Sequence, residues 1–249
     1  MAIKLTSDLH VVASGSLGFM MTDPFDCNCY LWEYADGQFA LFDSGAGREM
    51  EPMLDNLKQV AGDLSNIRYI FLTHHHADHF GGTAKLRMLS GALTVASGYS
   101  GALISSGDEE QIGLAKARSK GNYPADYRIH ACPIDIPLEG GDMLSIGRGG
   151  LTAIATPGHC RGALSFLFEL KDGRKALGCG DVVFPGGKIM LLNLPDCSIE
   201  DYGNTMDELN RMTIDVLLPG HAGVVMNDAS EHIAIAHSYF DKLIVPPSL

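Results

Sequence analysis

The chain has 249 residues and a formal net charge of −12, with 46% hydrophobic and 19% charged residues. This length permits one large domain or two small ones, which would bury roughly 70–75% of the unfolded surface. The acidic balance argues against a nucleic-acid partner and against binding to an anionic membrane surface. No apolar run approaches a membrane span, and the N-terminal residues are not typical of a signal peptide, so we expect a cytoplasmic protein.

The pattern of apolar residues predicts strands first and then strands mixed with helices. The predicted strands, in chain order, are 27–34, 39–43, 67–73, 93–97, 151–156, 163–170, 175–180 and 215–220. Helices are expected from about Glu49, from Gly82, from Ser198 and from Asp228, with a weakly patterned helix at 108–119. Ser198 with Asp201, and Asp228 with Glu231, have the spacing of capped helix starts. No linker or low-complexity tract interrupts residues 1–249, so we predict a single domain.

Four of the ten histidines lie within six residues, in the run Thr73-His74-His75-His76-Ala77-Asp78-His79. This run follows a predicted buried strand and precedes Gly81-Gly82. Protonated imidazoles crowded on one loop would repel one another, whereas a divalent cation with nitrogen and oxygen ligands resolves the crowding. The run therefore predicts a metal site, in which His75 is expected to face away from the ion because it alternates with its neighbours.

A shorter pattern, Pro-Gly-His, occurs at 157–159 and again at 219–221, each time after an apolar strand. Taken alone, it is either a common Pro-Gly turn or a turn that delivers a histidine at the end of a sheet. The six cysteines form no CxxC pair and are interpreted as small buried residues rather than as disulfide partners.

These motifs together resemble the metallo-β-lactamase-fold metallo-hydrolase superfamily. The histidine run matches its main signature, Asp43-Ser44-Gly45 matches an earlier motif, and Gly180-Asp181 and the two Pro-Gly-His turns match later ones in the family's order. The resemblance implies an α/β fold, a four-layer αββα sandwich of two mixed β-sheets flanked by helices. Asp181 stands where β-lactamases proper usually carry Cys or Ser, so the resemblance favours the glyoxalase II-like and lactonase-like dinuclear branch.

The resemblance also implies two divalent metal ions, most readily Zn, with Fe or Mn as alternatives. One ion would be held by His74, His76 and His159, the other by Asp78, His79 and His221, and Asp181 would bridge them. Asp43 would orient a ligand or a loop, although a helix cap or a turn residue is the alternative for this position. Lys188 is interpreted either as a contact for an anionic substrate group or as a solvated loop residue.

The expected chemistry follows from the metal pair, which would lower the pKa of bound water to near 7. A metal-bridging hydroxide would then attack an ester-like carbonyl of a small molecule, in a thioester, a lactone or an ester. Asp78 is the candidate catalytic residue, because it is a ligand that also lies where it can orient the nucleophile or move a proton. The alternatives are a mononuclear iron oxidoreductase similar to persulfide dioxygenases, a small-molecule phosphodiesterase, and a non-catalytic binding module. The expected partner is a small-molecule substrate, and a homodimer is left open.

The segment 98–133 lies between the first and the third of these motifs and holds three tyrosines and the acidic run 108–110. It is interpreted either as a lid or pocket wall over the metals or as a surface excursion with a capped helix.

Overall fold

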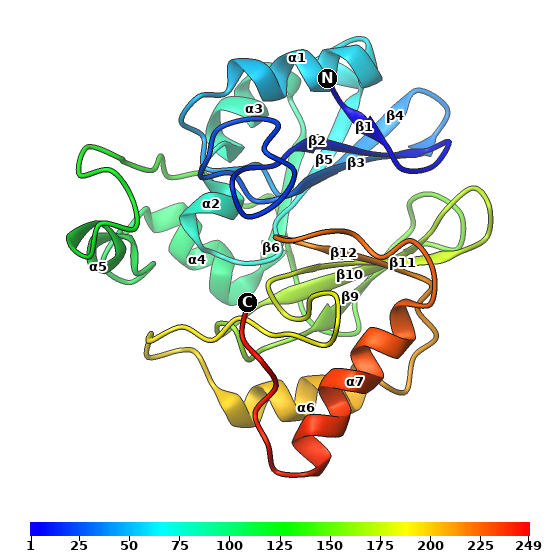
Figure 1. Cartoon of the computed structure of the whole chain (residues 1–249). Coiled ribbons are helices and arrows are strands. Elements are labelled where there is room, and N and C mark those ends of the chain that lie inside the picture. Colours follow the sequence, from blue (N-terminus) through cyan, green and yellow to red (C-terminus); the bar gives the residue numbers. More distant parts are fainter. The chain divides into compact units, whose positions relative to one another are not determined.

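Two β-sheets, one in each part of the chain, organise the structure (Figure 1). The computed structural model describes all 249 residues, which divide into two compact units, Met1–Leu138 and Glu139–Leu249. No linker-like composition marks the boundary between these units, and for this reason the sequence pattern predicted one domain. No helix of the chain is long and apolar enough to cross a bilayer.

The first unit contains a seven-stranded mixed sheet whose strands follow the order of the sequence. The strands are β1 (Ile3–Lys4), β2 (Leu9–Ala13), β3 (Cys29–Ala35), β4 (Gln38–Phe42), β5 (Ile67–Phe71), β6 (Leu93–Ser97) and β7 (Ile136–Leu138). Strands β1 to β4 pair antiparallel, whereas β4 to β7 pair parallel. The carboxyl ends of β4, β5 and β6 therefore lie at one edge of the sheet, the edge at which ligands bind in parallel α/β sheets.

The helices of the first unit are α1 (Glu51–Ala61), α2 (Ala77–Phe80), α3 (Thr83–Ser90), α4 (Gly98–Ser106) and α5 (Leu114–Ser119). Leu31, Leu41 and Ile70 of the sheet form one buried cluster with Leu57 of α1 and Leu86 of α3. Each such side chain contributes about 1.5–3 kcal/mol when it is withdrawn from water. This core fixes the strand ends from which the histidine run departs.

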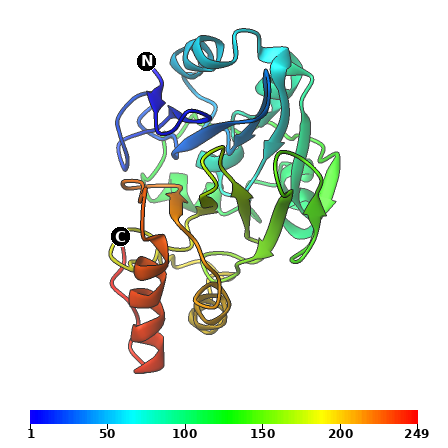
Figure 2. The same ribbon diagram turned by 90° about the vertical axis from the view of Figure 1, so that its right-hand side faces the viewer.

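The second unit contains a five-stranded sheet in the order β12-β11-β10-β9-β8. Its strands are β8 (Met143–Leu144), β9 (Leu151–Ala155), β10 (Leu164–Glu169), β11 (Lys175–Gly180) and β12 (Val216–Pro219), and only β11 and β12 pair parallel. Helices α6 (Ile199–Leu209) and α7 (Ala229–Asp241) lie on the same side of this sheet (Figures 1 and 2). Their side chains Tyr202, Met206 and Ile233 share a buried cluster with Leu177 and Leu217 of the sheet.

Most predicted elements are confirmed: the strands 93–97 and 175–180 match at both ends, and the other boundaries shift by one or two residues. The Ser198 hydroxyl accepts the Asp201 N–H at 3.1 Å, as the cap pattern predicted. Helix α7 begins where it was expected, but the cap was wrong: Asp228 adopts φ of 59° and its side chain makes no cap hydrogen bond. The predicted helix at 108–119 forms only over Leu114–Ser119. The strands β1, β2, β7 and β8 and the helices α2 and α4 were not predicted.

Candidate metal centre

The histidine run begins after the end of β5 and continues into α2, which holds Asp78 and His79. All of its residues are buried except Asp78, which is half-buried. His74 and His75 are each 1% exposed, His79 is 0% exposed and His76 is 9% exposed. Buried imidazole nitrogens need hydrogen-bond or metal partners, because removing them from water without a partner costs free energy. The run is therefore not a solvated polar loop.

His74 and His76 present ring nitrogens to each other. The Nε2 atom of His74 lies 3.1 Å from Nδ1 of His76, and the two rings are almost perpendicular, at 83°. Two imidazole nitrogens this close are arranged either for a hydrogen bond or for a shared cation. His75, between these two residues in the chain, has its Nδ1 atom 3.2 Å from the Ser100 hydroxyl on α4. Its ring also lies 5.3 Å from that of His76, so the expectation that His75 faces away from the ion stays a prediction.

Asp43, directly after β4, determines how His79 is oriented. Its Oδ2 atom lies 2.8 Å from Nδ1 of His79. Because a carboxylate only accepts, the hydrogen is on Nδ1, and the lone pair of His79 is on Nε2, which lies 3.7 Å from Asp78 Oδ2. Asp43 also accepts the N–H and the hydroxyl of Thr73, both at 2.8 Å. It caps no helix, since the N-cap of α1 is Met50, so the orienting role implied by the resemblance fits its contacts.

In the second unit, the loops after β9, β11 and β12 bring His159, Asp181 and His221 together. The Asp181 Oδ2 atom lies 3.6 Å from Nε2 of His159 and 3.4 Å from Nε2 of His221. The Gly220 N–H donates to the Gly180 carbonyl at 2.7 Å and so joins two of these loops. One carboxylate oxygen thus lies beside two ring nitrogens.

His159 is oriented by a backbone carbonyl and by a tight turn. Its Nδ1–H donates to the Met190 carbonyl at 2.9 Å, which leaves the lone pair on Nε2. The Tyr202 hydroxyl donates to the same carbonyl at 2.8 Å. Gly158 has φ of 139°, and a Cβ atom there would lie 2.6 Å from the Tyr202 ring, so the turn requires glycine. Of the two interpretations of the Pro-Gly-His pattern, the delivery of a histidine is the one that fits this geometry.

The predicted ligands therefore form two clusters, one in each unit. The N-terminal cluster is His74, His76, Asp78 and His79, and the C-terminal cluster is His159, Asp181 and His221. Each cluster offers imidazole nitrogens and carboxylate oxygens, all from buried residues except the half-buried Asp78, and this is the donor set that Zn and similar divalent ions take. The residues present fit such ions.

Two tyrosines support the clusters: Tyr202, which was not singled out from the sequence, and Tyr127, one of the three tyrosines noted in the 98–133 segment. Tyr202 carried no signal beyond its apolar position in a helix. Tyr127, in the 98–133 segment, is 4% exposed, and its hydroxyl lies 2.6 Å from the Ala46 carbonyl and 3.1 Å from the Ala77 carbonyl. Burial, and next the Asp78 carboxylate, raise the pKa of the Tyr127 phenol well above its usual range, so the hydroxyl stays a donor. Through Tyr127, the segment packs against the rest of the unit.

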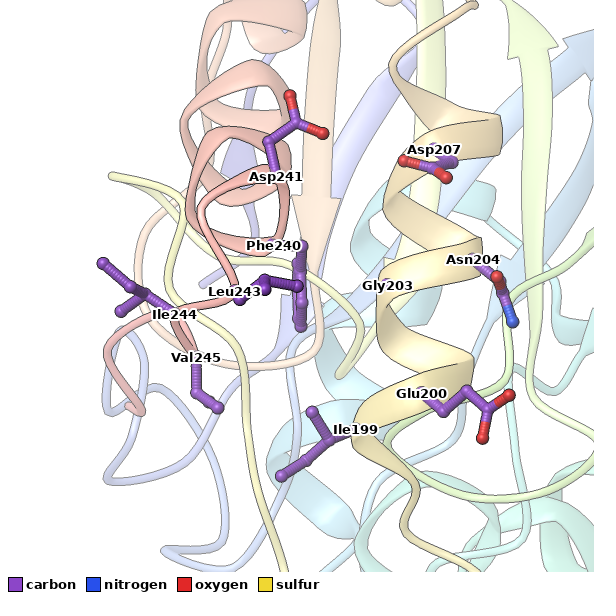
Figure 3. A pocket seen from close by; sticks show the side chains of 10 residues that line it. All are labelled: Ile199, Glu200, Gly203, Asn204, Asp207, Phe240, Asp241, Leu243, Ile244 and Val245. Carbon is purple, nitrogen blue, oxygen red and sulfur yellow. The ribbon is translucent and has the colours of Figure 1, made fainter.

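The cysteines and Lys188 are the remaining candidates, and of these Cys27 lies beside Asp43 and His79. None of the six cysteines forms a disulfide, and five of them are buried, as the packing interpretation expected. Lys188 is exposed, in agreement with a solvated loop residue. A groove of about 390 Å³ runs beside α6 and α7 and is lined by Ile199, Phe240 and Leu243 among others (Figure 3). No predicted ligand lines this groove, so it does not belong to the candidate centre.

Comparison with known families supports the superfamily that the sequence motifs indicated. Residues 22–221 match the Metallo-beta-lactamase superfamily, and the chain belongs to this superfamily. Among solved structures, a metallo-beta-lactamase of Cronobacter sakazakii superposes with a TM-score of 0.74 and 21% identity over 97% of this chain and 93% of the other. A subclass B3 enzyme of Bradyrhizobium japonicum gives a TM-score of 0.72 and 23% identity, over 97% and 91% of the two chains. These likenesses confirm the predicted fold of two mixed sheets flanked by helices.

Among curated proteins, the chain is similar to an acyl-coenzyme A thioesterase and to hydroxyacylglutathione hydrolases. It is 30% identical over 178 residues to the bovine acyl-coenzyme A thioesterase MBLAC2, a match that covers 68% of this chain and 61% of the relative. It is 28% identical over 155 residues to a hydroxyacylglutathione hydrolase of Cereibacter sphaeroides, over 57% and 49% of the two chains. The chain thus spans about half to three fifths of these relatives. Their names agree with the expectation of a metallo-hydrolase from the glyoxalase II-like branch.

Proposed function

We propose that this protein is a dinuclear metal-dependent hydrolase that cleaves thioesters of small molecules. In this proposal the N-terminal and C-terminal clusters act together on two divalent ions, most readily Zn. His74, His76 and His159 would hold one ion, Asp78, His79 and His221 would hold the other, and Asp181 would be the ligand that they share. The observation that carries the proposal is the Asp181 carboxylate oxygen at 3.6 Å and 3.4 Å from the Nε2 atoms of His159 and His221, since a bridging ligand needs such neighbours.

Two ions bound in this way supply a water of lowered pKa and a Lewis acid for the carbonyl oxygen. The residues of the chain then orient the ligands and move the proton. Asp43 and the Met190 carbonyl fix the hydrogen of His79 and of His159 on Nδ1, so both Nε2 atoms keep a lone pair. Without these acceptors either ring is free to place a hydrogen on the ligating atom.

Asp78 is the group that we assign to proton transfer. Its side chain is 15% exposed, whereas those of Asp43 and Asp181 are each 3% exposed, so a substrate reaches Asp78 most easily. The Asp78 carboxylate takes a proton from the attacking water and passes it to the leaving sulfur as the carbon–sulfur bond breaks. The products are a carboxylic acid and a thiol.

The choice of thioesters among ester-like substrates is supported by the relatives, which are named for acyl-coenzyme A and for hydroxyacylglutathione. A lactone is less favoured because the buried Phe184, near the place where lactonases carry a tyrosine, has no hydrogen-bond donor for a carbonyl.

The test is a substrate panel with the full chain, stripped of metal and reloaded with Zn, Mn or Fe. We expect hydrolysis of an acyl-coenzyme A or a hydroxyacylglutathione that depends on two equivalents of metal. His76→Ala should abolish it, and Asp78→Asn should lower kcat by about 10²–10⁴-fold. His237→Ala is the matched control, because His237 lies on α7 and pairs with Asp207 at 2.9 Å, outside both clusters.

Three outcomes overturn the proposal: full activity in the His76→Ala variant, turnover only of phosphodiesters, or oxygen consumption with a thiol persulfide on one iron. The last two would establish the alternative chemistries expected from the superfamily.

A further inference from the structure

We propose that Tyr127 is a positioning residue that holds Asp78 and His79 in place for the second metal ion. The inference rests on the proposed function, because it assigns those two residues as ligands of one ion. It concerns a contact that reaches the histidine run from the 98–133 segment.

Helix α2 depends on contacts with the rest of the unit for its helical conformation. It has four residues, Ala77–Phe80, and a helix this short is not stable alone in water. It nevertheless carries both Asp78 and His79. The orientation of these side chains therefore depends on what fastens the backbone of α2 to the rest of the unit.

Three segments fasten the carbonyl groups of α2 from outside the helix. The Asp78 carbonyl accepts the Cys27 N–H at 3.3 Å, and the His79 carbonyl accepts the Ser44 N–H at 2.7 Å. The Ala77 carbonyl lies 3.1 Å from the Tyr127 hydroxyl. Tyr127 is the contribution of the 98–133 segment to this set.

The Tyr127 hydroxyl also solves a problem created by close backbone packing. The loop after β4 approaches α2 so closely that a Cβ atom on Gly81 would lie 2.2 Å from the Ala46 carbonyl oxygen and 2.6 Å from the Ala77 carbonyl oxygen. Two carbonyl oxygens that converge on one place repel each other unless a donor lies between them. The Tyr127 hydroxyl is that donor, at 2.6 Å from Ala46 O, and it joins the loop to α2.

Tyr127 is itself held firmly enough to act as a support. The Arg118 guanidinium donates to the Tyr127 carbonyl at 2.7 Å and forms an ion pair with Glu109. The Tyr127 ring packs on Tyr123, with 5.3 Å between centroids, and Tyr123 packs on Phe25. Because the backbone and the ring of Tyr127 are both held, the position of its hydroxyl oxygen is fixed, as a positioning residue requires.

The test is Tyr127→Phe, which removes the hydroxyl and keeps the ring. The full chain, stripped of metal, is titrated with Co(II), and the affinity of each ion and the visible spectrum of the protein are recorded. We expect the ion assigned to Asp78 and His79 to bind about tenfold more weakly, with an altered Co(II) spectrum, while the affinity of the other ion stays unchanged. With a thioester that the wild type cleaves, kcat should fall at limiting metal, KM should change little, and excess metal should restore kcat.

The matched control is Tyr34→Phe, whose hydroxyl donates to Gln38 at 2.8 Å on an exposed hairpin, and which should bind both ions as the wild type does. If Tyr127→Phe does not fold, Glu109→Gln is used instead. It loosens Arg118 without touching the hydroxyl and should show the same selective loss to a smaller extent.

Unchanged affinities and an unchanged spectrum in Tyr127→Phe overturn the inference, and so does equal weakening of both ions, which would indicate general loosening of the unit. These results are distinguishable from failure of the proposed function. That failure would be visible in the wild type itself, as the absence of two bound ions or of thioester cleavage.

Discussion

Replacing Asp43 by Asn should weaken the binding of one metal ion without changing the fold. Asp43 accepts three hydrogen bonds, each at 2.8 Å, from the Thr73 N–H, the Thr73 hydroxyl and His79 Nδ1–H. An Asn side chain has one oxygen, so in either orientation its NH₂ group faces at least one of these donors. Hydrogen bonds to a buried charged acceptor are worth about 1.5–3 kcal/mol each, so we expect a loss of about 2–3 kcal/mol in the free energy of unfolding.

One orientation of the Asn side chain would reduce this loss of stability but would lower the affinity for metal. If the Asn NH₂ group donates to His79 Nδ1, the hydrogen of the imidazole moves to Nε2, the atom assigned to the ion. Loss of a hydrogen-bond partner that orients a metal-ligating histidine typically lowers metal affinity by 10–100-fold, which corresponds to about 1.4–2.7 kcal/mol. Only the ion assigned to Asp78 and His79 should be affected.

The assay is competition with a chromophoric chelator, together with urea unfolding of the metal-free chain. Asp43 has φ of 56°, and Asn tolerates this conformation well, so the substitution leaves backbone strain nearly unchanged. Asp63→Asn is the control, because Asp63 is an exposed carboxylate that accepts the Ser65 N–H far from the histidine run. Two ions bound with wild-type affinity by Asp43→Asn would refute the reasoning.

Three further predictions concern stability. Burial raises the pKa of Asp26 from 3.8 to about 6, so the folded chain keeps this proton longer than the unfolded chain. The stability that protonated Asp26 contributes is therefore lost as pH rises from about 4 to about 6, and the wild type should lose up to about 3 kcal/mol relative to Asp26→Asn over this window in urea unfolding. Free energies of unfolding that change with pH in the same way in the wild type and in Asp26→Asn would contradict this prediction. Gly158→Ala should lower Tm and the affinity for metal together, because its Cβ would lie 2.6 Å from Tyr202 at φ of 139°; a wild-type Tm would show that the turn yields. Ser198→Ala should cost about 1 kcal/mol by loss of the α6 cap, and unchanged unfolding would show that water replaces the hydroxyl.

Local patterns determined most of the elements in advance. Strands such as β5 and β10 are short, mostly apolar runs with one polar residue near the start, and the Ser198 cap needs only a hydroxyl three residues before an N–H. Such features depend on neighbours in sequence, so the sequence predicts them directly. Helix α4 was not predicted because Gly98, Ser100 and Gly101 are poor helix formers and its apolar residues have no clear spacing.

The cap of α7 shows where local rules fail. Asp228 and Glu231 have the expected spacing, but Asp228 adopts a left-handed conformation and its side chain does not reach back to the helix. The Ala229 and Ser230 N–H groups instead donate to the carbonyls of Asp215 and Ile214, 14 and 16 positions earlier in the chain. Contacts with the end of a neighbouring segment replaced the local cap.

The sequence by itself determined which residues are candidates for metal binding, because the histidine run, Asp181 and the two Pro-Gly-His turns are local motifs with recognisable spacing. Only the tertiary structure decided which groups orient them. The partner of His79 is 36 positions away, at Asp43, and the hydroxyl beside the Ala77 carbonyl is 50 positions away, at Tyr127. The physical reason is that a sequence specifies every donor and acceptor, whereas a hydrogen bond depends on a distance of about 3 Å that is set by the packing of the whole unit.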